Sequence, residues 1–380
     1  MNAKTTVKKT LALLLAACVL MGALAGCGKK DKPVTTGAIG VVKDEEFGNV
    51  YIDKTIEEFN ALGFAFGDSV DIEFDNGKSF KDIPYYSGYY VPVGEMLVCG
   101  YPGYPHPVIA ENYGAGTWEG FGILEDTKVT VTLNEKAKYS AVQELFALSY
   151  SDERKDFDSD IVFANFREVK GGDIKEGMFY RSASPCDDQH NRAACTNALV
   201  EQAGIRFVLN LSDNETKYAG YVEAEGFASQ YYDSLCREGN VLLLAMNANY
   251  RSDAFAKTIS EAFLEMTKHD GPVLVHCVEG KDRTGFVCTL LLALSGASAQ
   301  EIIDDYMITY DNYYGVTKEK KPDKYEAILG NVYDFLYCLC GAEKGADIGS
   351  LDLKAGAESY LARGGLTQEQ IASIEAYVSK

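Results

Sequence analysis

Apolar and polar positions alternate in short runs between residues 40 and 150. The run "VDIEFDNGKSF" (70–80) alternates and contains Asn76-Gly77, a pair that strongly predicts a hairpin. A second run, "KVTVTL" (128–133), alternates in the same way, which is typical of strands with one buried face. The pattern predicts a β-rich domain of roughly five to eight strands, with a short helix near 54–62.

The pattern changes after residue 150, where short apolar runs alternate with longer runs of helical spacing. Strands are predicted at 160–169, 177–183, 205–212, 228–234 and 272–277, and helices at 190–204, 214–226, 252–271, 284–296, 299–313, 323–340 and 366–379. Strands that alternate with helices predict an α/β domain with a mainly parallel central sheet flanked by helices. The polar stretch 148–160 separates the two patterns, so we expect domains at 40–150 and 151–380.

A basic segment followed by an apolar one stands at the N-terminus. Three lysines among the first nine residues precede the apolar stretch 11–24, and the tetrapeptide "LAGC" (24–27) follows. This order is typical of a secretory signal peptide, and about 14 apolar residues are too few to span a bilayer. We therefore expect an exported protein.

The tetrapeptide also resembles the lipobox of bacterial lipoproteins. The resemblance implies a signal peptide over 1–26, a lipid on Cys27 and a polar tether over 27–39. The protein is then expected to be held at the outer side of a bacterial cell membrane. Plain secretion is the alternative.

The composition narrows the class of partner. The net charge is −20, and removing the three lysines of residues 1–26 leaves −23. An acidic surface disfavours nucleic acid and wide docking onto anionic lipid. Ten cysteines in an exported chain leave disulfides and buried free thiols both open, Cys338 and Cys340 included. No paired Cys/His spacing is present, so we expect no metal and no cofactor.

The run "HCVEGKDRTG" (276–285) carries the candidate chemistry, because it links a buried strand to an apolar helix. N–H groups in a tight turn at a helix N-terminus form an anion site, and Arg283 adds a fork for two phosphate oxygens. A cation and a helix N-terminus also favour the thiolate form of a cysteine, which makes Cys277 a candidate nucleophile. The proposed phosphate-binding loop lies between and just after Cys277 and Arg283. Its other members are Val278, Glu279, Gly280, Lys281, Asp282, Thr284 and Gly285.

Attack of the Cys277 thiolate on phosphorus forms a phosphocysteine, which water then hydrolyses. We expect Thr284 to donate a hydrogen bond to the sulfur and make it a better leaving group. His276 is expected to orient the loop backbone through its ring nitrogens. The alternative for His276 is a core histidine without a part in the chemistry.

The loop resembles the signature loop of the cysteine-dependent protein tyrosine and dual-specificity phosphatases. Lysine-aspartate before the arginine is similar to the bacterial tyrosine/lipid phosphatases, as are "FREVKGGDIKEGMFYRSASP" (166–185), "LVEQAGIRFVLNLSDNE" (199–215) and "GGLTQEQIASIEAYV" (364–378). The resemblance covers about 160–380. It implies the cysteine phosphatase fold, Cys277 as nucleophile, Arg283 as phosphate binder, and Lys281 as a residue that favours acidic or phosphoinositide-like substrates. Arg181 is expected to hold the loop by hydrogen bonds to its carbonyl groups.

The general acid is less clear from the residues. Where that family has Asp-Leu-Arg, this chain reads Asn210-Leu211-Ser212. A leaving alkoxide or phenoxide needs a proton donor, and Asp282 is the first choice because it lies inside the loop. Asp213 and Asp233 are the alternatives, each expected at the carboxyl end of a strand. Asp282 as a structural acceptor for loop N–H groups remains equally open.

The β-rich region resembles the small β-barrel of the S-adenosylmethionine hydroxide adenosyltransferase family. The resemblance implies a barrel-like fold for 40–150, and we do not extend the activity of that family to this chain. Taken together, the sequence predicts an exported phosphatase whose substrate is a phosphorylated protein, a phosphoinositide or an inositol phosphate. The alternatives are a phytase-like inositol-phosphate phosphatase, a non-catalytic phosphate-binding module, and a protein whose main function lies in the β-rich domain.

Overall fold

The computed structural model describes residues 33–92 and 94–380. The chain divides into two compact units between Gln143 and Glu144, and each unit has a hydrophobic core built from its own residues. The predicted signal peptide, Cys27 and the first part of the tether lie outside the described residues.

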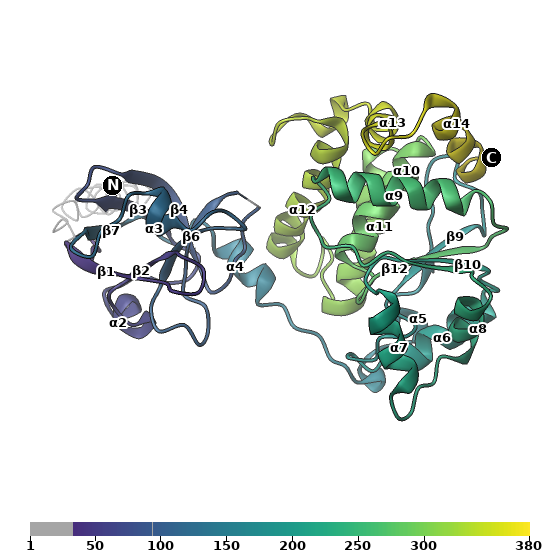
Figure 1. Cartoon of the computed structure of the whole chain (residues 1–380), viewed down its shortest axis with the longest axis horizontal. Helices are drawn as coiled ribbons and strands as arrows, with labels where there is room; N and C mark the ends of the chain where they lie inside the picture. The colour runs from purple at the N-terminus through teal and green to yellow at the C-terminus, as the bar shows by residue number, and fades with distance from the viewer. Residues whose placement is uncertain (1–32, 93) are drawn as a thin grey trace, which may run out of the picture. The chain divides into compact units, whose positions relative to one another are not determined.

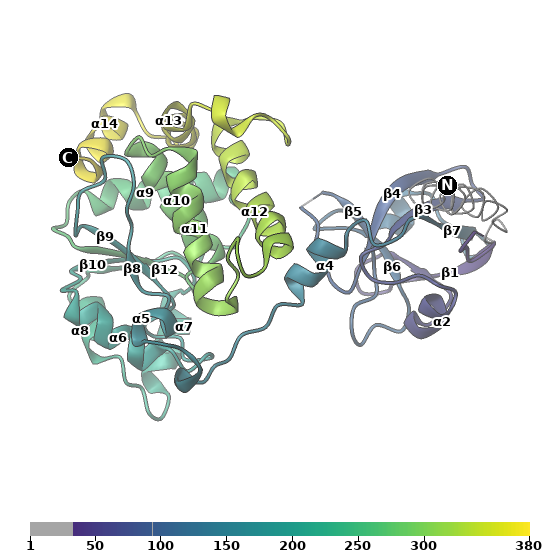
Figure 2. The same cartoon turned by 180° about the vertical axis from the view of Figure 1, so that it is seen from behind.

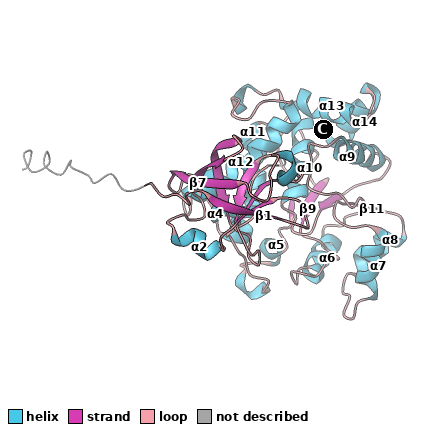
Figure 3. Ribbon diagram, turned by 60° about the vertical axis from the view of Figure 1, so that its left-hand side comes forward, coloured by secondary structure: helices cyan, strands magenta, loops and turns pink. Residues whose placement is uncertain are grey.

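The first unit is a β-barrel, as predicted for the β-rich region (Figure 3). Its core forms because alternate residues of each strand point inward; in β3 these are Val70, Ile72 and Phe74. The hairpin at Asn76-Gly77 joins β3 to β4, and Gly77 adopts φ +90°, a conformation that favours glycine. In barrel order the strands are β1 (Ile39–Lys43), β2 (Val50–Ile52), β6 (Val108–Glu111), β5 (Met96–Cys99), β4 (Ser79–Tyr86), β3 (Ser69–Phe74) and β7 (Lys128–Glu135).

Short helices accompany the barrel. The helix expected near 54–62 is α2 (Ile56–Ala61), which begins at a capping box formed by Thr55 and Glu58. Two further helices are α3 (Thr117–Gly120) and α4 (Ser140–Phe146), and the division between the two units falls within α4.

The second unit is built on a five-stranded sheet within the described residues. The order is β11 (Val241–Leu243), β10 (Phe207–Asn210), β12 (Val273–His276), β9 (Phe179–Ser182) and β8 (Arg167–Glu168). The first four are parallel to one another and β8 is antiparallel to β9, so the predicted mainly parallel sheet is confirmed.

Helices cover both faces of this sheet (Figures 1 and 2). One face carries α5 (Asp160–Phe163), α6 (Ala193–Gln202), α7 (Glu215–Glu223) and α8 (Gln230–Arg237). The other face carries α9 (Asp253–Met266), α10 (Asp282–Leu294), α11 (Ala299–Tyr314), α12 (Pro322–Cys340), α13 (Leu353–Arg363) and α14 (Gln368–Val378).

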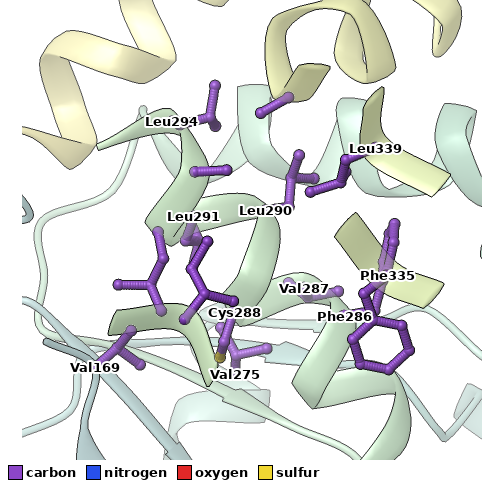
Figure 4. Packing of buried hydrophobic residues seen from close by; sticks show 14 of the residues in the cluster. Val169, Val275, Phe286, Val287, Cys288, Leu290, Leu291, Leu294, Phe335 and Leu339 are labelled. Carbon is purple, nitrogen blue, oxygen red and sulfur yellow. The ribbon is translucent and has the colours of Figure 1, made fainter. Parts of the chain in front are cut away.

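Helix α10 lies at the centre of the second core. Its residues from Thr284 to Leu294 are all buried, as expected for a helix that is apolar on every side. Figure 4 shows Val275 of β12 beneath α10, and Phe335 and Leu339 of α12 beside it. Because α10 is enclosed by apolar side chains, its N-terminus is held in place, and so is the end of the loop that leads into the helix.

Two predicted strands are wrong. Residues 228–234 lie largely in α8, because Tyr232 and Leu235 are buried at a spacing of three residues, which fits one face of a helix. Most of 160–169 is also not a strand. The Ser159 hydroxyl caps α5 by accepting a hydrogen bond from the Val162 amide, and the strand β8 holds two residues.

The eight cysteines among the described residues are free thiols, and Cys338 and Cys340 are two of them. In the same part of the chain, no helix combines the length and apolar character needed to cross a bilayer. Nor do three or more His, Cys, Asp or Glu side chains gather there in an arrangement that holds a metal ion.

Candidate active site

The candidate site begins where three parallel strands end side by side. In the register of the sheet, His276 of β12 lies between Asn210 of β10 and Ser182 of β9. Each of these residues is the last of its strand. Ligands of parallel α/β sheets bind at this carboxyl edge, and Cys277 is the first residue beyond it.

The loop from Cys277 to α10 is shaped by a close backbone approach. Gly280 adopts φ +68°, and a Cβ atom there would lie 2.2 Å from the carbonyl oxygen of Ser182. Only glycine fits this position, because both the dihedral angle and the space exclude a side chain. The loop therefore lies directly on the backbone that follows β9.

Carbonyl groups of the loop are bonded to the surrounding protein. The Val278 oxygen accepts from the Ser184 amide at 2.8 Å, and the Glu279 oxygen accepts from the Tyr313 hydroxyl at 2.7 Å. The Gly280 oxygen accepts from Nη2 of Arg181 at 2.8 Å. Because these carbonyl oxygens are bonded outward, the loop N–H groups are left for an anion at the centre.

A buried charge network supports these contacts. Arg181 is fully buried and donates from Nη1 to Oδ2 of Asp305 at 2.5 Å, while Nε of Arg167 lies 3.1 Å from Oδ1. Burial acts to raise the pKa of Asp305, but the two guanidinium groups outweigh it and lower the pKa. Asn165 and Thr309 complete the network, with Asn165 donating to the carbonyl oxygens of Glu279 and Gly280 at 3.3 Å.

The reactive groups lie on this supported loop. Cys277 is 3% exposed, and Nη1 of Arg283 donates to the Met246 carbonyl at 3.0 Å, which uses one of the five N–H groups of the guanidinium. The Thr284 hydroxyl is fully buried and has no hydrogen-bond partner among the described residues. The expected bond from Thr284 to the Cys277 sulfur is therefore absent from this structure.

His276 is the end of a chain of buried hydrogen bonds. Its Nδ1 lies 3.1 Å from the Cys277 carbonyl oxygen and its Nε2 lies 3.2 Å from the Tyr232 hydroxyl. Burial lowers the pKa of His276 to about 4, so the ring is neutral. A carbonyl only accepts, so Nδ1 carries the proton and Nε2 accepts from Tyr232.

Asn210 is the next residue in this series of hydrogen bonds, and its side-chain amide explains why an aspartate is not needed at position 210. Nδ2 of Asn210 donates to the Tyr232 hydroxyl and to Oδ2 of Asp213, both at 2.9 Å. An amide supplies both donors, whereas a carboxylate at residue 210 would face the carboxylate of Asp213. Tyr232 and Asn210 thus fix the tautomer of His276.

The charges at the rim of the loop compensate one another. Nζ of Lys281 lies 3.4 Å from Oε2 of Glu279 and 3.8 Å from Oδ2 of Asp282, and 6.0 Å from the ring centroid of Tyr314. Burial acts to lower the pKa of Lys281, but Asp282, Tyr310 and Glu279 outweigh it and raise the pKa. Lys281 is therefore a charged group whose charge is already paired.

The three candidate general acids lie in different surroundings. Asp282 begins α10 and its side chain is 58% exposed. Asp213 is fully buried; burial acts to raise its pKa, but hydrogen bonds from Lys217 and Asn210 outweigh this and lower it, so it is held ionised. Asp233 lies in α8 rather than at a strand end, where it accepts from the Tyr218 hydroxyl at 2.9 Å and pairs with Arg237.

Several residues that shape the site were not found from the sequence. Asp305 pairs with Arg181 across 124 residues, and Tyr313 and Asn165 bond the loop from distant elements. No local pattern marks such long-range partners. Asn165 offers one signal in the structure, a positive φ of 49°, which asparagine tolerates better than most residues.

A strand, a cysteine-containing loop and a buried helix in this order agree with the class that the sequence predicted, the cysteine-dependent phosphatases. The tyrosine phosphatase family model matches residues 163–379, and the chain belongs to that family. A tyrosine-protein phosphatase of Nostoc commune is 44% identical over 52 residues, which are 14% of this chain and 18% of that protein.

Solved structures show more distant similarity. TpbA of P. aeruginosa has 19% sequence identity, with 51% of this chain and 91% of that chain covered and a TM-score of 0.28. The core catalytic domain of the PP-IP phosphatase SIW14 from S. cerevisiae has 21% identity, with 45% and 94% covered and a TM-score of 0.27. An uncharacterised conserved protein from Thermotoga maritima has 26% identity, with 27% and 39% covered and a TM-score of 0.22.

Proposed function

We propose that the second unit hydrolyses phosphate monoesters through a phosphocysteine on Cys277. The observation that carries the proposal is the loop whose carbonyl groups are tied outward at the N-terminus of the buried helix α10. Arg283 binds the phosphate, and the buried, unpartnered hydroxyl of Thr284 is the donor for the sulfur or for a phosphoryl oxygen. His276 holds the carbonyl of Cys277 and thereby orients the loop backbone.

Asp282 is our proposed general acid. Asp213 is held ionised by its hydrogen bonds, and Asp233 is engaged with Tyr218 and Arg237. Asp282 is the first residue of α10 and is exposed, and its ion pair with Lys281 spans 3.8 Å, a looser contact than those that hold Asp213 and Asp233. A general acid must reach the scissile oxygen and carry a proton when the bond breaks.

The substrate we favour carries a single phosphate on an aromatic ring, as phosphotyrosine does. Substrates with several phosphates need several unpaired cations around the nucleophile. Lys281, the cation expected to attract them, is paired with Glu279 and Asp282. This pairing supports a substrate with a single phosphate over phosphoinositides and inositol phosphates, and the tyrosine phosphatase family match favours phosphotyrosine among such substrates.

Turnover of p-nitrophenyl phosphate by the reduced protein in the presence of a chelator tests the mechanism. The wild type is expected to be active, Cys277→Ser to be inactive, and Asp282→Asn to lose roughly 100-fold or more in kcat and to lose the alkaline limb of the pH profile, because the general acid acts only while protonated. Asp253→Asn, which removes a carboxylate from the exposed first residue of α9, serves as the matched control. A wild type that binds phosphate and never turns over the ester would favour the phosphate-binding module.

We also propose that the protein is exported and anchored through a lipid on Cys27. The basic and apolar leader and the "LAGC" tetrapeptide support this proposal. Labelling of growing cells with a radioactive fatty acid is expected to mark the wild type and leave Cys27→Ala unlabelled. Equal labelling of both proteins would exclude Cys27 as the attachment site.

A further inference from the structure

We propose that Tyr150 is a positioning residue of the phosphate site, acting through Glu279. Tyr150 lies outside residues 163–379, which the family model matches, yet it belongs to the second unit and contacts the phosphate loop. Its hydroxyl donates to the Glu279 carboxylate and so offsets part of the negative charge beside the phosphate loop. The inference deepens the proposed function and rests on it for the identity of the bound group.

Two stacked tyrosines hold Glu279 by its side chain and its main chain. The Tyr150 hydroxyl donates to Oε1 of Glu279, and the Tyr313 hydroxyl donates to the Glu279 carbonyl at 2.7 Å. The two rings are stacked, with centroids 4.8 Å apart and planes at 22°. Because the rings support each other, both hydroxyl groups approach the same loop residue from fixed positions.

Arg192 holds the segment around Tyr150 in place through hydrogen bonds and ring contacts. This arginine is 2% exposed, and its two terminal nitrogens donate to the Ser151 carbonyl and to Oδ1 of Asp152, each at 2.9 Å. Its guanidinium carbon lies 4.9 Å from the ring centroid of Tyr150 and 5.2 Å from that of Tyr313. A buried guanidinium over two aromatic rings is a stabilising arrangement, so the segment is part of the site wall.

The position of Glu279 makes its charge matter. Glu279 follows Cys277 by two residues, so its carboxylate stands beside the loop that receives a phosphate with up to two negative charges. The other carboxylate oxygen lies 3.4 Å from Nζ of Lys281. Burial and the hydrogen bond to Glu279 raise the pKa of Tyr150, so its hydroxyl remains a donor across the physiological range.

Loss of the Tyr150 hydroxyl removes a donor from Glu279 and leaves its charge less neutralised. The carboxylate then repels the phosphate more strongly, which weakens ground-state binding without a direct effect on the chemical step. Tyr150→Phe is the informative change, because the phenyl ring keeps the stack on Tyr313 and the contact with Arg192. Tyr337→Phe is the matched control, since it removes a tyrosine hydroxyl that bonds the Ala346 carbonyl outside the loop.

The test uses the full-length wild type, Tyr150→Phe, Glu279→Gln, the double variant and Tyr337→Phe. Calorimetric titration with inorganic phosphate and steady-state turnover of p-nitrophenyl phosphate are measured on each protein. Tyr150→Phe is expected to raise Kd and KM about 2- to 10-fold with kcat within about twofold, because the lost hydroxyl acts on the phosphate only through the charge of Glu279. The double variant is expected to return to the values of Glu279→Gln, and Tyr337→Phe to match the wild type.

The outcomes separate this inference from the proposed function. An active wild type whose phosphate affinity is unchanged in Tyr150→Phe overturns the inference alone. A double variant as weak as Tyr150→Phe also overturns it, because the effect then does not pass through the Glu279 charge. A wild type that binds phosphate with the expected pattern but has no turnover overturns the proposed function alone, and one that binds no phosphate overturns both.

Discussion

The two units of the chain use buried polar groups in different ways. In the barrel, Asp68 is 1% exposed, accepts from the amides of Ala65 and Ala137 and pairs with Lys136, so its carboxylate ties the turn before β3 to the segment after β7. In the second unit, Asp305 pairs with arginines from β8 and β9, and through Arg181 it supports the phosphate loop. In the barrel this buried carboxylate bonds main-chain amides and one exposed lysine, whereas in the α/β unit the buried carboxylate bonds two arginines that support a site.

This difference predicts how well each unit tolerates the substitution of a buried carboxylate. Removing the Asp68 carboxylate leaves the amides of two exposed residues, Ala65 and Ala137, which water is able to solvate. Removing one member of a buried ion network leaves uncompensated charge. The two units also differ in their spectroscopic signals. The single tryptophan, Trp118, lies in the barrel unit, while most helices lie in the second unit, so fluorescence and far-ultraviolet circular dichroism follow the two units separately.

The largest effect is expected from Asp305→Asn. The change leaves Arg181 and Arg167 buried beside a neutral amide, and the free energy of unfolding of the second unit is expected to fall by about 3–5 kcal/mol. Asp68→Asn in the barrel is expected to cost about 1 kcal/mol, because its partner Lys136 is 55% exposed. Urea unfolding followed by both signals measures the pair, and equal losses in the two variants would contradict the comparison.

A pH-dependent effect is expected at His276. Because burial lowers the pKa of His276 from 6.5 to about 4, the unfolded chain binds a proton between these values that the folded chain does not. Stability therefore falls as pH falls from about 6.5 to about 4, by up to about 3 kcal/mol for this group. Urea unfolding of wild type and His276→Asn at pH 7 and pH 4.5 isolates the contribution. Parallel losses in both proteins would show that the histidine is not responsible.

The smallest of the three effects on stability is expected from a pair of glycine changes. Gly280→Ala places a Cβ atom 2.2 Å from the Ser182 carbonyl oxygen, whereas Gly77→Ala in the barrel hairpin meets open space. Both residues have positive φ, so each change costs about 1 kcal/mol from the dihedral angle, and Gly280→Ala costs about 1 kcal/mol or more in addition. Only Gly280→Ala is expected to abolish turnover of an aryl phosphate. Normal activity in Gly280→Ala would mean that the loop does not need its close approach to Ser182.

Much of this architecture follows from local pattern. The alternation at 70–80 predicted the β3–β4 hairpin, and the apolar runs at 205–212 and 272–277 predicted β10 and β12. These predictions are possible because a buried strand has a recognisable pattern of apolar residues over a few consecutive positions. The loop at 276–285 was found because its residue types and order carry the chemistry. Residues 228–234 were misread, since a short run that mixes tyrosine and serine fits a strand and a helix alike.

The supporting residues of the site follow from tertiary structure alone. The loop is bonded directly by Tyr313 and Tyr150, and through Arg181 by Asp305, all from outside the loop. The sequence around these residues contains no pattern that predicts a buried contact. Asn210 is a departure from the family pattern that became intelligible only with Tyr232 and Asp213 beside it. The reacting residue can be identified from the local sequence. The residues that hold it in place cannot, because they come from distant parts of the chain.

The face of α11 that supports the loop has a consequence for how this protein is able to vary. Asp305, Thr309 and Tyr313 follow one another at intervals of four, so a single face of one helix delivers a carboxylate, a hydroxyl and a phenol to the network. Inserting one residue between Asp305 and Thr309 would rotate the following residues by about 100° and turn the hydroxyl and the phenol away together. The number of residues in α11 between Asp305 and Tyr313 is therefore as constrained as the three side chains themselves.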